Sequence, residues 1–207
     1  MAVKPPSLPA SLDRAVMACA GEEVTDSLFE GGALENIEAP SLDFSGCVFR
    51  GVRFGPCEAG RVYFMDCAFE GCDLSAFRFR EGALRRVAFS NCRATGTRLD
   101  HMILRDVSFA ACQLDYATFA DCRLQDVRLR ESRLRRAMWH TCTQKGLLLE
   151  DCDLEGAELI ATRMAGADLS TCRLDGLRAS IDALRGTTIS PEQSPAILSL
   201  CEITIKL

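Results

Sequence analysis

Apolar side chains, most of them large, recur at every fifth position from Phe29 to Ala179. Gln144 is the one polar residue in this series, and the register never slips. A second series of smaller, mostly apolar residues lies two positions earlier, and it includes ten of the twelve cysteines. Side chains two positions apart lie on the same side of an extended segment, and the residue between them points outward. The pattern therefore predicts a repeated three-residue extended segment with one buried side.

The remaining two positions of each five are rich in Gly, Ser, Asp and Arg, which are typical of turns. An α-helix is excluded because five residues advance by about 500° at 3.6 residues per turn, which would spread the large side chains around the helix. A flat strand is excluded because an odd repeat would change faces each time. Extended segments joined by regular corners must wind into a coil with an apolar interior.

Four segments show the repeat most clearly: CAFEG (67–71), CDLSA (72–76), CDLEG (152–156) and ADLST (167–171). The sequence resembles the pentapeptide-repeat family over residues 29–179, nearly three-quarters of the chain. The resemblance implies an all-β fold, a right-handed four-sided parallel β-helix with about twenty residues per coil and between about seven and eight coils. The uninterrupted register implies a smooth rod without projecting loops.

We expect three regions: an N-terminal cap over 1–26, the β-helix over 27–181, and a C-terminal cap and dimerisation segment over 182–207. Solenoids need such caps because their last coils would otherwise expose the core. Residues 11–23, SLDRAVMACAGEE, are typical of a short helix with Ala15, Val16 and Cys19 available to cover the first coil.

At the carboxyl end, Ser190, Pro191 and Gln193 match an N-cap, a first-turn proline and a capping-box glutamine. Pro195 predicts a short or kinked helix. Residues 200–207, LCEITIKL, alternate apolar and polar side chains and predict an edge strand.

Quinolone-resistance members of the family dimerise through this end, so the resemblance favours a homodimer, and the alternative is a self-contained cap on a monomer. The candidate dimerisation residues are Ile197, Leu198, Leu200, Ile203, Ile205 and Leu207.

The first sixteen residues, MAVKPPSLPASLDRAV, lack the basic and apolar segments of a signal peptide, and no apolar run is long enough to cross a membrane. We therefore expect a cytoplasmic protein with reduced thiols. Cys72, Cys92 and Cys112 fall into one column at a spacing of twenty residues. We interpret the column as small apolar packing rather than a metal or redox ladder, because no C-x2-C pair is present. No cofactor or metal is expected.

Catalytic motifs are also missing from the sequence, which has no P-loop, dinucleotide-binding glycine motif or G-x-S-x-G. His101 and His140 both fall on outward corner positions, so His140 and the inward Cys142 should not converge. A filled, narrow core leaves no cavity for a small molecule. These features predict a protein that is not an enzyme.

The resemblance implies a function as well: binding to a type II topoisomerase, chiefly DNA gyrase or topoisomerase IV, and protection from fluoroquinolones or albicidin-like toxins. The family's proposed mechanism is DNA mimicry by a negatively charged rod. This sequence departs from that picture, because the twenty-residue stack predicts no continuous acidic stripe. The candidate partner-binding residues are Glu150, Asp151, Asp153, Glu155 and Glu158.

Two alternatives remain open. The rod could be a scaffold for another cytoplasmic protein through outward apolar residues, which are otherwise ordinary surface residues. These residues are Tyr63, Met65, Ile103, Tyr116, Met138, Leu148 and Ile160. The arginines of the block 123–136 could instead contact nucleic acid, although a net negative charge disfavours direct nucleic-acid binding. Gln144 could mark a local bulge beside Trp139, or be a tolerated polar residue at the core edge.

Overall fold

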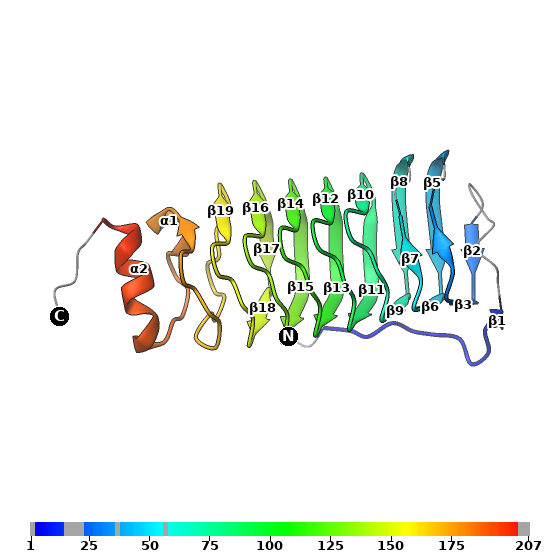
Figure 1. The fold of residues 1–207 in the computed structure, drawn as a ribbon, viewed down its shortest axis with the longest axis horizontal. Helices are drawn as coiled ribbons and strands as arrows, with labels where there is room; N and C mark the ends of the chain where they lie inside the picture. The colour runs from blue at the N-terminus through cyan, green and yellow to red at the C-terminus, as the bar shows by residue number, and fades with distance from the viewer. Residues whose placement is uncertain (1–2, 15–22, 36–37, 56–57, 203–207) are drawn as a thin grey trace.

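The chain forms a rod of about eight stacked coils (Figure 1). The computed structural model describes residues 3–14, 23–35, 38–55 and 58–202. Paired strands are parallel, and within the rod their partners lie one twenty-residue coil apart, as in the pairing of Phe69 with Phe89. The predicted right-handed, four-sided parallel β-helix is therefore confirmed.

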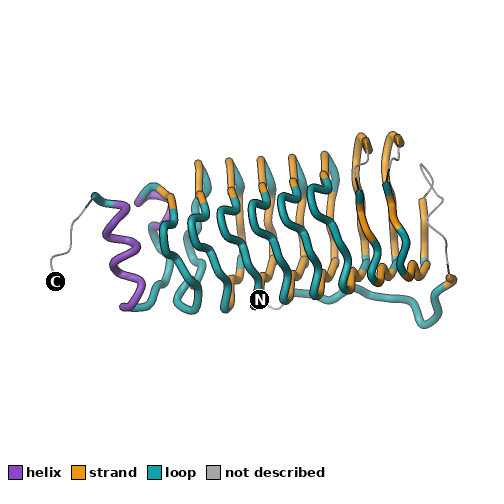
Figure 2. Tube along the Cα trace, viewed as in Figure 1, coloured by secondary structure: helices purple, strands orange, loops and turns teal. Residues whose placement is uncertain are grey.

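Each coil has four sides, which we number face 1 to face 4 in chain order. The long strands turn a corner and contribute to two faces, whereas face 3 is held mainly by single bridges between extended residues (Figure 2). The ladder of faces 1 and 2 contains β1 (Asp13–Arg14), β2 (Glu23–Thr25), β3 (Ser27–Glu30), β5 (Glu38–Ser45), β6 (Val48–Arg50), β8 (Glu58–Met65), β9 (Ala68–Glu70), β11 (Ala83–Ser90), β13 (Ile103–Ala110), β15 (Arg123–Arg130), β17 (Thr143–Lys145) and β18 (Leu148–Glu150). Face 3 begins with β4 (Ala33–Leu34) and β7 (Arg53–Phe54) and continues through bridges at Asp73, Arg93, Gln113, Arg133, Asp153 and Arg173. Face 4 begins with the first residues of β5 and β8, which pair at Ala39 and Ala59 before these strands turn onto face 1. It continues with β10 (Arg78–Arg80), β12 (Arg98–Asp100), β14 (Thr118–Ala120), β16 (Met138–His140), β19 (Glu158–Ile160) and β20 (Arg178–Ala179).

The interior is built from the two inward series that the sequence predicts. On face 2 the rings of Phe29, Phe49, Phe69, Phe89 and Phe109 stack in one column, with centroids 4.6 to 5.0 Å apart. These rings are almost completely buried. Stacked aromatic rings in van der Waals contact contribute dispersion energy as well as burial of apolar area, so this column is a main source of stability.

The corners fall two positions after each large inward residue and have a left-handed backbone conformation. Asp66, Arg86 and Asp106 adopt φ angles of 54°, 52° and 55° at successive copies of one corner. Glycine takes this conformation without a steric cost, as at Gly71 with φ of 61°. Because the corners repeat in register, outward side chains of successive coils line up in columns along the rod.

The buried cysteines form short contacts with the backbone rather than with one another through disulfides. The thiol of Cys92 donates to the carbonyl oxygens of Phe69 and Ser90, at 3.5 and 3.4 Å. Ser132 replaces cysteine in this column and donates to the Arg130 carbonyl at 2.8 Å. No group of three or more potential ligands in the described ranges is placed to hold a metal ion. The column packs as a row of small side chains.

The N-terminal region differs from the sequence-based prediction. Residues 11–23 are not one helix, because Asp13–Arg14 form β1 against β3 and Glu23 begins β2. The predicted capping residues Ala15, Val16 and Cys19 lie outside the described residues. Residues 3–12 run back along the outside of the rod (Figure 1). Strand pairing at Asp13–Arg14 therefore covers the β3 edge of the first coil.

Three short helical segments cover the last coil: α1 (Ile181–Leu184), η1 (Pro191–Gln193) and α2 (Ser194–Leu200). The predicted capping box between Ser190 and Gln193 is present. The Gln193 amide also donates to the Leu169 carbonyl at 2.7 Å, which ties this segment to the rod. None of the helices in the described ranges is long and apolar enough to cross a bilayer.

The predicted edge strand over 200–207 is not seen at its start, because Leu200 ends α2 and residues 201–202 form a turn. Residues 203–207 lie outside the described part of the chain.

Candidate interaction surface

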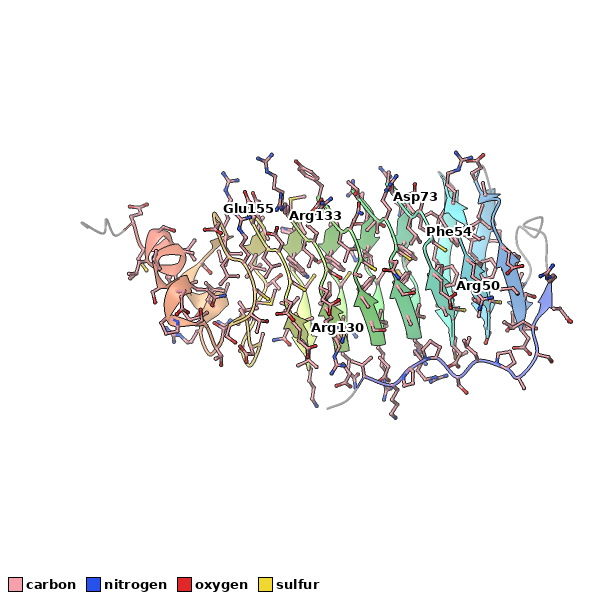
Figure 3. The ribbon with its side chains drawn as sticks, turned by 60° about the horizontal axis from the view of Figure 1, so that its bottom comes forward. Arg50, Phe54, Asp73, Arg130, Arg133 and Glu155 are labelled. Carbon is pink, nitrogen blue, oxygen red and sulfur yellow. The ribbon has the colours of Figure 1, made fainter. Side chains whose placement is uncertain are left out.

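Face 3 carries the most regular arrangement of charged side chains on the rod. Two outward columns flank its inward leucines and phenylalanines, because the residues on either side of each inward position point to solvent. The first column is Arg53, Asp73, Arg93, Gln113, Arg133, Asp153 and Arg173. The second column is Glu35, Gly55, Ser75, Thr95, Asp115, Arg135, Glu155 and Asp175. Along the first column, arginines alternate with Asp73, Gln113 and Asp153. Figure 3 shows Asp73, Arg133 and Glu155 along this side of the rod.

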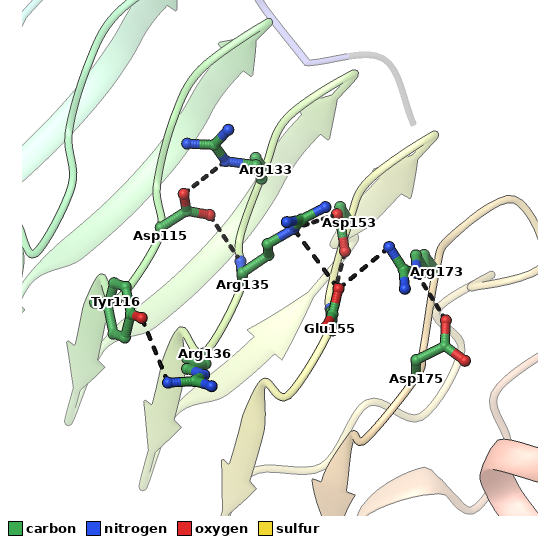
Figure 4. Close-up of polar contacts among 9 residues, drawn as sticks. All are labelled: Asp115, Tyr116, Arg133, Arg135, Arg136, Asp153, Glu155, Arg173 and Asp175. Carbon is green, nitrogen blue, oxygen red and sulfur yellow. Dashed lines mark hydrogen bonds and ion pairs between the residues drawn. The ribbon is translucent and has the colours of Figure 1, made fainter.

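Ion pairs connect the two columns between neighbouring coils (Figure 4). Arg133 Nε lies 2.6 Å from Asp115 Oδ2, and Arg135 Nε lies 2.6 Å from Asp153 Oδ2. Glu155 Oε2 lies 3.2 Å from Arg173 Nη1 and 3.8 Å from Arg135 Nε. Exposed pairs of this kind each stabilise a fold by about 0 to 1 kcal/mol, so the ladder matters more for surface charge than for stability.

Asp153 accepts two hydrogen bonds within the ladder. Its burial opposes ionisation, but the hydrogen bond from Arg135, the backbone amide of Glu155 at 3.1 Å and the charge of Arg173 together lower its pKa. The neighbouring Arg135 guanidinium has its pKa raised, first of all by its hydrogen bond to Asp153. Both groups are therefore charged at neutral pH, and the charge of each compensates the charge of the other.

Next to this ladder is an open cleft of about 540 Å³. Tyr116 and Arg136 project from one side of it, with the Arg136 guanidinium carbon 5.9 Å from the Tyr116 ring centroid. Gly156 and Gly176 continue the same column and have no side chains, so the space in front of them is open. The cleft combines an aromatic ring, guanidinium groups and carboxylates, which can form hydrogen bonds with a polar protein surface.

The five acids proposed as a partner site do not form one patch, because the coil separates them. Glu150 ends a strand of face 2, Asp151 occupies the next corner, Asp153 and Glu155 lie on face 3, and Glu158 begins a strand of face 4. Four of them are within 4 Å of an arginine, and Glu158 Oε1 lies 2.6 Å from Arg178 Nη1. The structure therefore distributes and neutralises most of this cluster.

The arginines of the block 123–136 are distributed in the same way. Arg123 lies on face 1, Arg128 and Arg130 lie on face 2, and Arg133 and Arg135 lie on face 3. Figure 3 shows Arg130 on a different side of the rod from Arg133. A contiguous basic run in the sequence is thus not a contiguous basic surface, which disfavours direct binding of nucleic acid through this block.

The candidate dimerisation residues fall into three groups. Ile197 and Leu200 pack against the core from α2, so they cover the last coil of their own chain. Leu198 is half-buried on the same helix. Ile203, Ile205 and Leu207 lie outside the described residues. Dimerisation through this end stays a prediction that depends on Leu198 and the final residues.

Gln144 keeps its place in the twenty-residue register, since it pairs with Leu124. Its side-chain amide donates to the carbonyl oxygens of Arg163 and Ala165, at 3.4 and 2.9 Å, and residues 163–165 form no strand opposite β17. A cleft of about 420 Å³ opens beside it, lined on the next coil by Arg163 and Ala165. Gln144 therefore spans a local gap in the face 1 ladder without a bulge in the register.

The two histidines lie on the surface as the register predicts. His101 occupies a corner with φ of 56°, and its Nδ1 lies 3.9 Å from Asp121 Oδ2. Cys142 is buried and donates its thiol to the carbonyl oxygens of Phe119 and His140, at 3.2 and 3.5 Å. The His140 ring and the Cys142 thiol therefore do not act as a base and nucleophile pair.

Comparisons with known proteins identify the repeat. A family model described as a pentapeptide repeat region matches residues 84–159, and one for eight copies of pentapeptide repeats matches residues 145–176. The chain is a pentapeptide-repeat protein. Members with this solenoid fold are typically non-enzymatic scaffolds. No curated protein matches the chain.

Solved structures of other pentapeptide-repeat proteins are similar to the rod. HetL, involved in heterocyst differentiation regulation in the cyanobacterium Nostoc, matches with a TM-score of 0.53 and 18% identity, over 81% of this chain and 83% of HetL. Full-length QnrB1, a plasmid-mediated fluoroquinolone resistance protein, matches with a TM-score of 0.44 and 14% identity, over 89% of this chain and 100% of QnrB1. At its low identity, the HetL match shows the fold alone.

Proposed function

We propose that this pentapeptide-repeat protein binds a type II topoisomerase, DNA gyrase or topoisomerase IV, and protects it from quinolone or albicidin-like inhibitors. The observation that supports the proposal is the unbroken rod: its core is filled, so only its outer columns can contact a partner. A rod with a net charge of -5 has the opposite sign to a groove that binds duplex DNA. Such a rod competes with DNA for that groove.

The form of mimicry differs from a simple acidic stripe. The carboxylates of face 3 are paired with arginines of neighbouring coils, so the negative potential comes from the whole rod and from acids such as Asp151. Long-range electrostatic attraction then brings the two proteins together, and the positive and negative side chains of face 3 determine which partner surface is complementary.

The test is a gyrase supercoiling and cleavage assay, in which the purified protein is titrated with and without a fluoroquinolone. We expect rescued supercoiling or reduced drug-stabilised cleavage at stoichiometric protein, and inhibition at higher protein because a DNA competitor also blocks the substrate. Absence of any effect on both gyrase and topoisomerase IV would contradict the proposal.

A pair of charge-reversal variants locates the contact. Asp151→Lys changes a corner carboxylate close to the proposed acidic site, and Glu81→Lys makes the same change at a distant corner. We expect Asp151→Lys to weaken the effect on gyrase at least tenfold and Glu81→Lys to change it little. Equal effects of both variants would mean that only net charge matters.

A scaffold for a different protein is the second candidate, and one part of face 1 favours it. Tyr63 and Ile103 lie in one outward column and are 37% and 41% exposed, and Met65 lies in the neighbouring column. Arg85 and Arg105 flank them. This mixed apolar and basic surface suits an acidic protein partner. If gyrase is unaffected, the scaffold function would be supported by capture of one acidic protein. Tyr63→Ala and Ile103→Ala should each abolish that capture.

The homodimer is part of the same proposal. Leu198 lies on α2 at the end of the rod, and the other candidate residues Ile203, Ile205 and Leu207 come after this helix in the sequence. Sedimentation equilibrium should give twice the chain mass of 22.7 kDa, and Leu198→Glu should reduce it to one chain mass. A wild-type monomer at micromolar concentration would contradict dimerisation.

A further inference from the structure

The N-terminal segment 3–12, which we call the arm, lies along the corner between face 1 and face 2 (Figure 3). Two backbone amides of the arm donate to carboxylates of this corner. The Lys4 amide donates a hydrogen bond to Asp106 Oδ1 at 3.1 Å, and the Ser7 amide donates one to Asp66 Oδ1 at 2.8 Å. The arm is thus attached to coils that follow it by 59 and 102 residues in the chain.

The arm touches the rod with every third residue. Val3, Pro6, Pro9 and Leu12 are half-buried, and the residues between them are exposed. A period of three is that of a polyproline II helix, which has three residues per turn and leaves its backbone amides available to other partners. The prolines of the arm favour this conformation because they fix φ close to its value.

The length of one polyproline II turn of the arm matches the length of two coils of the rod. The bonded amides of Lys4 and Ser7 are three residues apart, and their acceptors Asp106 and Asp66 are forty residues apart, which is two coils. One turn of polyproline II advances by about 9.3 Å. Two coils at a strand spacing of about 4.8 Å advance by about 9.6 Å. Successive turns of the arm therefore meet equivalent positions of the rod.

The outward column of face 2 next to this corner contains buried apolar residues. Val48 and Ala68 occupy outward positions of face 2 and are nevertheless 2% and 8% exposed. The same column continues with the small residues Ala88 and Ser108. The Cβ position of Gly46 lies 3.5 Å from Pro9 Cδ, an ordinary van der Waals distance, so Pro9 lies directly against this part of the rod. Beyond the reach of the arm, the column changes to Arg128.

We propose that this corner is a binding site for polyproline II segments, and that the arm is its resident ligand. Recognition requires a proline-rich segment with apolar residues at every third position. It also requires two free backbone amides three residues apart, which meet Asp66 and Asp106. A ligand of this kind exchanges with the arm, so the site couples arm release to binding of a proline-rich partner. The proposal is independent of the topoisomerase.

The test is made in the full-length chain. It removes the two backbone N–H donors of the arm and keeps the polyproline II conformation. Lys4→Pro with Ser7→Pro deletes both amide protons and keeps the polyproline II preference. The matched control, Leu8→Pro with Ala10→Pro, adds two prolines at exposed positions of the same arm. NMR reports the outcome through the heteronuclear NOE of the Ser11 amide and the methyl signals of Val48 and Ala68.

We expect the donor-deleted variant to show a mobile arm and shifted Val48 and Ala68 methyl signals, and the control to resemble the wild type. An arm that stays ordered without the two amides would overturn the role of the carboxylates. Unchanged signals from the Phe stack show that the rod itself remains folded.

Recognition is then measured by adding the synthetic peptide of residues 3–12, VKPPSLPASL, to the donor-deleted variant. We expect the methyl signals to return to their wild-type positions. A peptide with one glycine inserted between Pro6 and Ser7 should bind at least tenfold more weakly, because its amides no longer match two coils. Equal binding of both peptides, or no binding of either, would overturn the proposal.

Discussion

Arg135 and Asp153 lie eighteen residues apart in the chain, and their Nε and Oδ2 atoms are 2.6 Å apart on face 3. Neither residue could be assigned to the other from the sequence without the coil length, because the pair joins neighbouring coils. The contact explains why an acidic cluster in the sequence is not an acidic patch on the rod. The face 3 carboxylates other than Asp175 each meet an arginine that the previous or next coil supplies. Asp175 pairs with Arg173 of its own coil.

The coupling between these two side chains should be small. In a double-mutant cycle of Arg135→Ala and Asp153→Ala, we expect an interaction energy of about 0.2 to 1 kcal/mol from urea denaturation, because both side chains contact solvent. The coupling should fall further in high salt. An energy of several kcal/mol would show that the ladder is a main support of the fold.

The phenylalanine column should be far more important for stability. Phe69 is fully buried, and its centroid lies 4.8 Å from that of Phe49 and 4.6 Å from that of Phe89. Phe69→Ala should reduce the free energy of unfolding by about 3 to 5 kcal/mol, because it removes buried area and leaves a cavity. The exposed substitution Arg80→Ala should change it by less than about 0.5 kcal/mol, which provides the control.

Gly82 should not tolerate a side chain. A Cβ at this inward position would lie 1.8 Å from the carbonyl oxygen of Val62 on the previous coil. Gly82→Ala must therefore push two coils apart, and we expect a loss of about 1 to 3 kcal/mol in urea denaturation. An unchanged denaturation midpoint would contradict the close approach of these coils.

The buried thiols should be unreactive in the native protein. Burial raises the pKa of the Cys67 thiol, and the neighbouring Cys47 raises it further, so Cys67 stays protonated at neutral pH. Cys201 is exposed. Alkylation with iodoacetamide followed by mass spectrometry should modify Cys201 within minutes and Cys67 only after denaturation. Rapid modification of Cys67 in the folded protein would contradict this packing.

Acid should release the arm. The hydrogen bond from Arg86 lowers the pKa of Asp66 below its ordinary value, and the Ser7 amide lowers it as well. Because the pKa is lower in the folded state, the contribution to stability is complete above about pH 4 and is lost as the pH falls through the folded-state value.

The NOE of the arm amides should therefore be constant from pH 5 to 8 and fall only below about pH 4. In Asp66→Asn, the change at low pH should be smaller. Release of the arm near pH 6 would indicate a different titrating group.

The five-residue period was enough to predict the coil, the inward series and the outward columns. The capping box at Ser190 and Gln193 was also predicted, because it depends on residues three positions apart. The arm was missed, although Pro6 and Pro9 were visible at the right spacing. Their partner is a corner whose residues are spread over the next hundred positions, and no local pattern identifies it.

The sequence by itself therefore determined the fold, since each five-residue unit contains its own inward residues and its own corner. The tertiary structure alone decided which charges meet and where the arm lies. Contacts between coils depend on the number of residues per coil and on the spacing of parallel strands, as in the pairing of Ser7 with Asp66. The coil length and the strand spacing are properties of the stacked coils, so a surface contact of this kind forms only after the chain has folded into the β-helix.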